Sequence, residues 1–204
     1  MNVYSRFEED AQHAILEALD FLNRLAPVSG ELRTHLQNTF HVAGYSKDEL
    51  LLRAGQISEY AWFLHKGSVR WFHFEREKEV TNWFTIERSA ILAAKSFYGR
   101  ISSIESIAAL GNCITVGLTY NELQDCYNRF PETLLMGRKV SDYYQGVLMD
   151  YNRIMRFNRA IERYEFLEEV FPSLLYSVPV AYLASFINMD VATFYKIRSE
   201  RRKN

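Results

Sequence analysis

The sequence predicts an α+β protein: an N-terminal antiparallel β-barrel or jelly roll flanked by helices, then a long helix, then a C-terminal helix-turn-helix domain. Three observations predict this order. Apolar residues recur at helical spacing near the start and over the last third of the chain, short aromatic and β-branched runs with Gly turns fill the middle, and two short helices close the sequence. We expect boundaries at residues 1–130, 131–157 and 158–204.

The first expected element is a helix in "FEEDAQHAILEALDFLNRLAP". Its apolar residues fall at helical spacing, and Pro27 ends the pattern. These residues are Ile15, Leu16, Leu19, Leu22 and Leu25. A second short helix is expected in "GELRTHLQNTF".

The barrel is expected from Phe40 onward. The stretch "LLLRAGQISEYAWFLHKGSVRWFHFEREKEVTNWFTI" alternates short apolar runs with Gly55, Gly67 and a charged turn at residues 75–78. Such closely spaced hairpin signals are typical of a small antiparallel barrel. Two more strands, "ESIAAL" and "CITVGLT", flank a tight turn at residues 111–112.

After "RFPE" the spacing becomes helical again. An apolar stripe recurs in alternating steps of three and four, with only Asn158 interrupting it. Its members are Val140, Tyr144, Val147, Tyr151, Ile154 and Ile161. The narrow stripe predicts a seam between two copies of the chain, formed by the first five; a helix packed on its own barrel is the alternative. A further amphipathic helix, "AIERYEFLEEVFP", is expected to follow.

The closing stretch "VPVAYLASFINMDVATFYKIRSERRKN" predicts two short helices around a sharp turn. Asn188 tolerates the left-handed conformation that such a turn requires, and Asp190 can cap the second helix by accepting from Ala192 or Thr193. One apolar set should face inward: Val178, Leu183, Phe186, Ile187, Phe194 and Ile197.

Composition limits the function classes. The net charge of -1 makes any nucleic-acid footprint a local one. The two cysteines have no metal-ligand spacing, and the N-terminus shows no signal peptide. No apolar run has the length of a membrane span. Together these features predict a cytoplasmic protein. The histidines show no metal-site spacing, and His41, His65 and His73 are expected in strands.

No enzyme is expected, because P-loop, HExxH and nucleophile-elbow motifs are lacking and the close carboxylate pairs lie in a turn and on a solvated helix.

The middle of the chain, "LLLRAGQISEYAWFLHKGSVRWFHF", resembles the cyclic-nucleotide-binding barrel of the Crp–Fnr family of bacterial regulators. The matching residues are Leu52, Gly55, Tyr60, Phe63, Lys66 and Gly67. "LTYNELQDCYNRFPE" resembles the family's link to its dimerisation helix, and the closing stretch resembles its helix-turn-helix. The resemblance implies a homodimeric, effector-responsive transcription regulator that binds double-stranded DNA, with RNA polymerase as a candidate partner.

In this chain, the segment that matches the family's cyclic-AMP cassette departs from the family's pattern. Ala93 and Ala94 stand near the family's glutamate, and Ser103 stands near its arginine, so a cyclic phosphate would lose its strongest charge-assisted contact. We therefore expect an effector other than cyclic AMP, of unknown identity, and no bound cofactor. The residues expected to line its pocket are Lys95, Ser96, Arg100, Ser102 and Ser103.

The expected DNA-reading helix departs as well. Val191 and Ala192 stand where family members carry base-reading arginine and glutamate, and neither can form a bidentate pair with a base. The expected DNA contacts are Thr193, Tyr195, Lys196, Arg198, Ser199, Arg201 and Arg202. Two hypotheses therefore remain: a DNA-binding regulator, or a dimeric sensor or interaction module that keeps the fold and binds DNA weakly or not at all.

Overall fold

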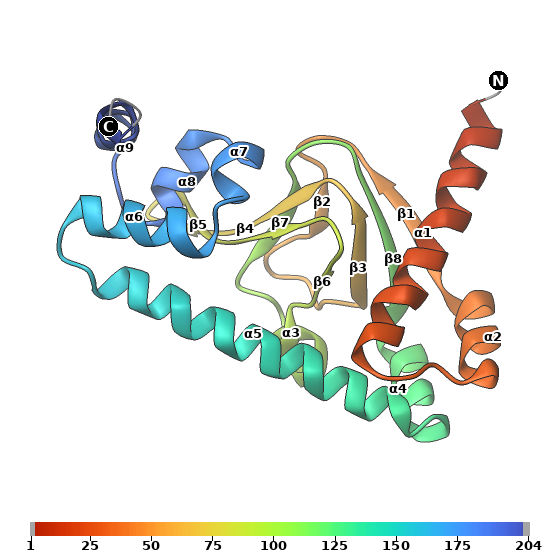
Figure 1. Cartoon of the computed structure of the whole chain (residues 1–204). Helices are drawn as coiled ribbons and strands as arrows, with labels where there is room; N and C mark the ends of the chain where they lie inside the picture. The colour runs from red at the N-terminus through yellow and green to blue at the C-terminus, as the bar shows by residue number, and fades with distance from the viewer. Residues whose placement is uncertain (1–2, 202–204) are drawn as a thin grey trace. The chain divides into compact units, whose positions relative to one another are not determined.

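Two compact units make up the structure, a computed structural model that describes residues 3–201, with side chains from residue 10 onward. The first unit combines the chain up to Arg70 with Thr85–Ser141, and the second combines Trp71–Phe84 with the chain from Asp142 onward. Figure 1 gives the order of the elements. Two four-stranded sheets and the helices around them confirm the predicted fold class. Over residues 3–201, no helix has the length and apolar character needed to cross a membrane.

Sheet A has the strand order β1-β8-β3-β6 and lies in the first unit. Its strands are β1 (His41–Tyr45), β8 (Cys113–Thr119), β3 (Tyr60–Lys66) and β6 (Ser89–Ile91). β3 pairs antiparallel with both β8 and β6, and Phe63 lies opposite Val116 and Ala90. His41 and His65 are strand residues as predicted.

Sheet B has the strand order β2-β7-β4-β5. Its strands are β2 (Leu50–Leu52), β7 (Ser106–Ala109), β4 (Ser68–Glu75) and β5 (Lys78–Ile86). Arg76 and Glu77 both have positive φ, as the tight turn between β4 and β5 requires, so the predicted charged turn is confirmed. The outer part of this hairpin belongs to the second unit.

Four helices precede the long helix: α1 (Val3–Leu25), α2 (Gly30–Thr39), α3 (Ala94–Gly99) and α4 (Tyr120–Arg129). α1 and α2 were predicted, although Leu16 of the expected apolar set is 45% exposed. Neither α3 nor α4 was predicted from the sequence. The signal for α4 was present, because Thr119 and Glu122 form a capping box in which each side chain accepts a hydrogen bond from the other residue's backbone amide.

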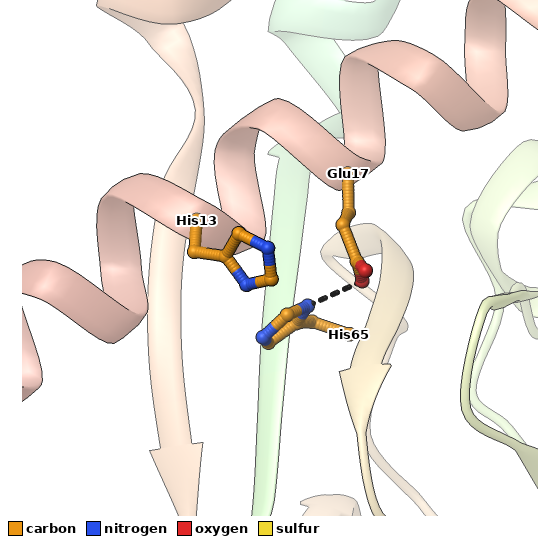
Figure 2. Close-up of side chains that lie close together, drawn as sticks. All are labelled: His13, Glu17 and His65. Carbon is orange, nitrogen blue, oxygen red and sulfur yellow. Dashed lines mark hydrogen bonds and ion pairs between the residues drawn. The ribbon is translucent and has the colours of Figure 1, made fainter.

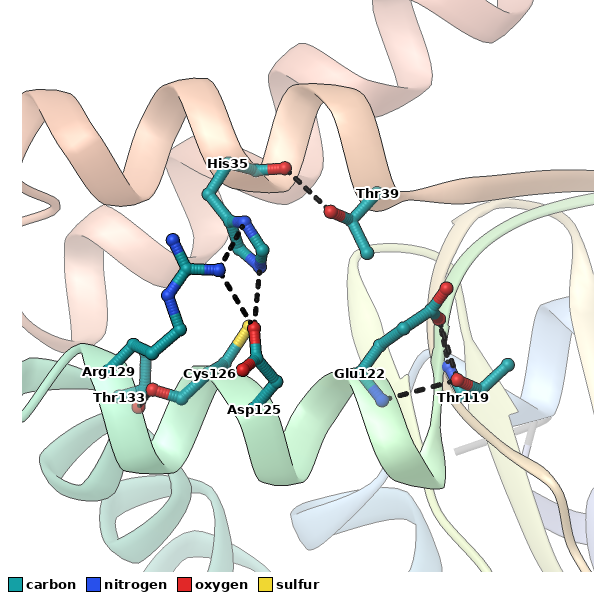
Figure 3. A network of polar contacts seen from close by, with 8 residues as sticks. All are labelled: His35, Thr39, Thr119, Glu122, Asp125, Cys126, Arg129 and Thr133. Carbon is teal, nitrogen blue, oxygen red and sulfur yellow. Dashed lines mark hydrogen bonds and ion pairs between the residues drawn. The ribbon is translucent and has the colours of Figure 1, made fainter.

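A polar network ties α2 to α4 (Figure 3). The Arg129 guanidinium donates to Asp125 at 3.0 Å, and His35 of α2 lies 3.6 Å from the same carboxylate. Thr133, one turn beyond α4, donates its hydroxyl to the Cys126 carbonyl at 3.0 Å. Below this network the apolar side chains of α1, α2 and α4 pack in one cluster that includes Leu19, Leu36 and Cys126.

The long helix α5 (Glu132–Arg156) begins and ends one residue inside the expected range of 131–157, so the apolar stripe runs past its end. Asn158 lies in the break rather than within the helix, and Ile161 belongs to the next helix, α6 (Ala160–Val170). The break is stabilised locally, because the Arg163 guanidinium donates to the Phe157 carbonyl at 2.8 Å and Glu162 accepts from the Arg159 amide at 3.1 Å.

The second unit contains α7 (Leu174–Ser177), α8 (Val180–Phe186) and α9 (Val191–Arg201). All six residues of the predicted inward-facing set are buried. Asn188, between α8 and α9, has a φ of 49°, which confirms the left-handed residue expected there. The β4–β5 hairpin packs on α8, since the Trp83 and Phe84 rings contact Phe186 and the Thr81 amide donates to the Ser185 hydroxyl at 3.0 Å.

Two glycines of the first unit allow a matched stability test. Gly55 and Gly67 have φ values of +90° and +95°, so either Gly→Ala change adds roughly 1–2 kcal/mol of backbone strain. At Gly55 the added methyl meets open space, whereas at Gly67 it would lie 2.6 Å from the Cys113 sulfur and 2.7 Å from the Asn112 carbonyl oxygen. Gly67→Ala should therefore cost about 1–3 kcal/mol more than Gly55→Ala. Urea denaturation followed by tryptophan fluorescence measures the difference, and equal midpoints for the two variants would contradict this account.

Candidate functional site

The region around α3, where the family resemblance places the effector cassette, is hydrogen-bonded within itself. Ser96 is buried, accepts from the Ser58 amide at 2.9 Å and donates to the Ile101 carbonyl at 2.6 Å. The Ser103 hydroxyl accepts from the Glu105 amide and donates to the Glu105 carbonyl. The Ser96 hydroxyl therefore joins α3 to the loop before β3 and to the loop after α3, and the Ser103 hydroxyl bonds within that second loop.

Of the two charged residues of the expected pocket, Arg100 is paired with a carboxylate and Lys95 is exposed. Arg100 donates to both carboxylate oxygens of Glu59 at 2.7 Å and to the Ser58 carbonyl, and its guanidinium lies over the Tyr120 ring. Lys95 and Ser102 are exposed. An anion at this place would have to compete with Glu59 for Arg100, so the local chemistry does not favour a phosphate.

A cavity of about 140 Å³ lies in the first unit. Its lining is almost entirely apolar and comes from sheet A, α1, α2, α4 and the first turns of α5, with Tyr98 of α3. Representative lining residues are Ala18, Phe21, Phe63, Ala90, Val116, Met136 and Val140. An engineered apolar cavity of about 150 Å³ stays dry and binds benzene, so this space suits a small uncharged ligand.

A few polar atoms reach the cavity lining. The Tyr98 and Tyr127 hydroxyls lie 3.0 Å apart, and Cys126 contributes a thiol. Burial raises the pKa of the Cys126 thiol to about 11, and burial together with the Tyr98 hydroxyl raises the pKa of Tyr127. Cys126 and Tyr127 therefore stay neutral near pH 7, and they could offer hydrogen bonds but no charge.

The exposed surface of α9 is the candidate nucleic-acid interface. Asp190 caps the helix as expected, since its carboxylate accepts from the Thr193 amide at 2.8 Å and from the Thr193 hydroxyl at 2.6 Å. These two bonds lower the pKa of Asp190, so it stays charged at the helix N-terminus. Thr193 is thus already engaged, while Tyr195, Lys196 and Ser199 are exposed.

The arginines of α9 are partly engaged in the second unit. Arg201 pairs with Glu165 at 2.7 Å and with Glu168 at 2.8 Å, and Arg198 donates to the Leu175 carbonyl at 3.2 Å. Arg202, also expected to contact DNA, lies outside the described residues. Among the cations of α9 that the structure describes, Lys196 is therefore the most accessible to a phosphate.

The five expected seam residues of α5 are largely covered within the single chain. Ile154 is fully buried, and Val140, Tyr144, Val147 and Tyr151 are half-buried. In the second unit, Tyr151 stacks on Phe186 with ring centroids 4.8 Å apart.

A different face of α5 carries exposed apolar side chains. Leu148 and Met149 are 54% and 70% exposed, and Leu134 and Leu135 are also exposed. Leu148 follows Leu134 by fourteen residues, and Met149 follows Leu135 by the same number. Fourteen residues are close to four helical turns, so all four side chains lie on one face of α5. Sequence periodicity did not identify this face, because Arg138, Asp142 and Gln145 interrupt it.

The comparisons with known proteins agree with this architecture. Neither the family models nor the curated proteins include a match to the sequence. Among solved structures, FixK2 from Bradyrhizobium japonicum has a TM-score of 0.68 at 16% identity, with 81% of this chain and 85% of that chain covered. A mutant CooA from Carboxydothermus hydrogenoformans has a TM-score of 0.66 at 18% identity, covering 86% and 81%.

The global regulator CLP of Xanthomonas campestris, described as responsive to c-di-GMP, has a TM-score of 0.62 at 14% identity, and the match covers 83% of this chain and 90% of CLP. Identities this low show the fold alone. The chain therefore has the fold of the Crp–Fnr regulators, which confirms the predicted resemblance at the level of the fold.

Proposed function

We propose that this chain is a homodimeric, DNA-binding transcription regulator that responds to an uncharged effector. The observation that carries the proposal is the helix-turn-helix of the second unit, whose recognition helix α9 keeps Tyr195, Lys196 and Ser199 exposed. The fold shared with FixK2, CooA and CLP supports the same assignment. CLP is described as a global regulator.

A second candidate is a dimeric sensor or interaction module that binds DNA weakly. It is favoured by the start of α9, where Asp190 places a negative charge and Val191 and Ala192 expose apolar side chains. The ion pairs of Arg201 also reduce the positive charge available to a phosphate. DNA binding distinguishes the two candidates.

Under the first candidate, Lys196→Ala should weaken operator and scrambled DNA alike, because a lysine that meets a phosphate carries no sequence information. Each phosphate neutralised contributes roughly 0.9 to the slope of log affinity against log salt, so a dimer should lose about 1.8 from that slope. Fluorescence anisotropy at several salt concentrations, on a candidate operator and a scrambled duplex, measures both quantities.

Lys66→Ala is the matched control, because it removes the same charge from an exposed site in the first unit. It should leave the salt slope unchanged. Asp190→Ser should act in the opposite direction to Lys196→Ala, since it keeps a capping hydroxyl and removes the negative charge. A wild type that binds neither duplex at low salt would favour the interaction module.

We further propose that the two copies associate through the exposed face of α5. The double variant Leu148→Glu, Met149→Glu would bring charges against one another across the two-fold axis, so sedimentation should show monomer. Its unfolding temperature, measured at a concentration where wild type is monomeric, should match that of wild type because both side chains are exposed.

Val147→Glu serves as the comparison, because it alters the stripe that sequence periodicity selected. Val147 is half-buried within its own chain, so a charge there should lower the unfolding temperature of the monomer. If Val147→Glu dissociated the dimer without loss of stability, and the double variant remained a dimer, the seam would be the stripe predicted from sequence.

The effector is proposed to be small, uncharged and largely apolar. Arg100 and Ser96 are engaged at the cassette, whereas the cavity lined by Phe63 and Val116 offers apolar surface. Isothermal titration with cyclic AMP should therefore give no saturable heat, while benzene should raise the unfolding temperature.

Ala90→Leu should abolish the benzene response by filling the cavity, because Ala90 contributes to its lining. Ala192→Leu, the same change on the exposed surface of α9, should leave that response intact. Saturable binding of cyclic AMP, or a benzene response that survives Ala90→Leu, would contradict the assigned effector class.

A further inference from the structure

Three potential metal-ligating side chains meet between α1 and β3 (Figure 2). His13 and Glu17 stand four residues apart on α1, so they share one face of the helix. His65 comes from the end of β3, and its Nδ1 lies 2.7 Å from a Glu17 carboxylate oxygen. One donor atom from each residue lies within 4.8 Å of the other two. The sequence predicted no metal site, because His13 and His65 are far apart in the chain.

Packing of α1 on sheet A creates this arrangement. Ala14 and Ala18 are buried against Phe63 and Val116, which fixes the face of α1 that meets the sheet. His65 lies two residues after Phe63, where the pairing of β3 with β8 is irregular, and its side chain points toward α1 (Figure 2). The approach of His65 to α1 is thus a consequence of core packing.

His65 and Glu17 are held in place, whereas the exposed His13 side chain is free to rotate. The side chains of His65 and Glu17 are 10% and 22% exposed and hold one another by their hydrogen bond. His13 is exposed, and its ring stands edge-on to the His65 ring with centroids 5.2 Å apart. Bonds of about 2.1 Å to one ion require donors roughly 3.4 Å apart, so a small rotation of His13 would complete the set.

The donor chemistry selects the class of ion. Two imidazoles and one carboxylate suit zinc and other first-row transition metals, whereas calcium and magnesium prefer sites built from oxygen. The exposed Arg88 guanidinium, 3.4 Å from Glu17, can turn toward solvent when a cation arrives. In the described part of the chain, this is the one group of three His, Cys, Asp or Glu residues that brings its donor atoms so close.

We propose that His13, Glu17 and His65 bind one divalent first-row transition-metal ion, and that the bound ion links α1 to β3. The site lies within the first unit and does not depend on DNA binding. Zn²⁺ is the probe for affinity and Co²⁺ the probe for the ligand type. The experiment uses the full chain, without a histidine tag, reduced and treated with chelator before titration.

Wild type should bind one Zn²⁺ per chain and unfold at a higher temperature when the ion is present. Loss of an outer hydrogen-bond partner alone weakens metal sites by about 10–100-fold, so His13→Ala should weaken Zn²⁺ by at least about tenfold. Glu17→Gln should do the same, while its amide can still pair with His65. The near-ultraviolet spectrum of bound Co²⁺ should lack a thiolate charge-transfer band, and this result would exclude the two cysteines as ligands.

His41→Ala is the matched control. His41 also pairs with a glutamate, Glu122, at 2.8 Å, but no third donor joins them in the described structure. The proposal stands if His13→Ala and Glu17→Gln weaken Zn²⁺ and His41→Ala does not. It is overturned if wild type shows no saturable binding up to millimolar Zn²⁺, or if His13→Ala leaves the affinity unchanged. Because His13 is exposed, the His13→Ala variant is expected to fold normally.

Discussion

The first unit depends on one constraint: sheet A is apolar on both faces. Trp62, Leu64 and Ile91 are buried on one face, and Phe63 and Val116 are buried on the other. A sheet whose strands alternate apolar and polar residues can expose its polar face to water. Sheet A has no polar face, so the face that carries Phe63 and Val116 must be covered by helices. α1, α2 and α4 supply that cover, and their clusters meet the sheet at Phe63 and Leu118. The cavity is lined by these helices and by sheet A, and the cluster of His13, Glu17 and His65 lies between α1 and β3.

Much of this could be predicted from the sequence because it rests on local patterns. Gly and charged turns between apolar runs predicted the strands, and Asn188 with Asp190 predicted the turn and cap before α9. What the sequence leaves open depends on partners far away in the chain. Periodicity identified the apolar stripe of α5 but not which surface covers it, and Tyr151 stacks on Phe186 of the same chain. The family resemblance placed Ser96 and Arg100 in the expected effector pocket, while their hydrogen bonds to Ile101 and Glu59 could be known only from the folded structure.

In the second unit, the interactions that stabilise α9 oppose the DNA binding proposed for this helix. The Asp190 carboxylate stabilises the start of α9 by accepting two bonds from Thr193, yet the same charge repels a phosphate at the helix N-terminus. Arg201 stabilises the packing of α9 on α6 through Glu165 and Glu168, at the expense of free positive charge. Such surface pairs contribute at most about 1 kcal/mol each. A duplex that brings a phosphate near Arg201 could therefore compete for its guanidinium at modest cost, and phosphate contacts remain the main source of affinity open to this helix.

The proposed metal ion and the proposed apolar ligand would act on the same helix. α1 contributes His13 and Glu17 to one site, and Ala18, Phe21 and Leu22 to the wall of the other. An ion that links α1 to β3 would hold the helix against sheet A, and a ligand in the cavity would press on the same contact. If either ligand changes the position of α1, thermodynamic linkage requires each to alter the affinity for the other by the same factor. The cavity also touches Met136 and Val140 of α5, the helix that continues into the second unit. The packing of α1 on sheet A is thus the contact through which both ligands could influence α5.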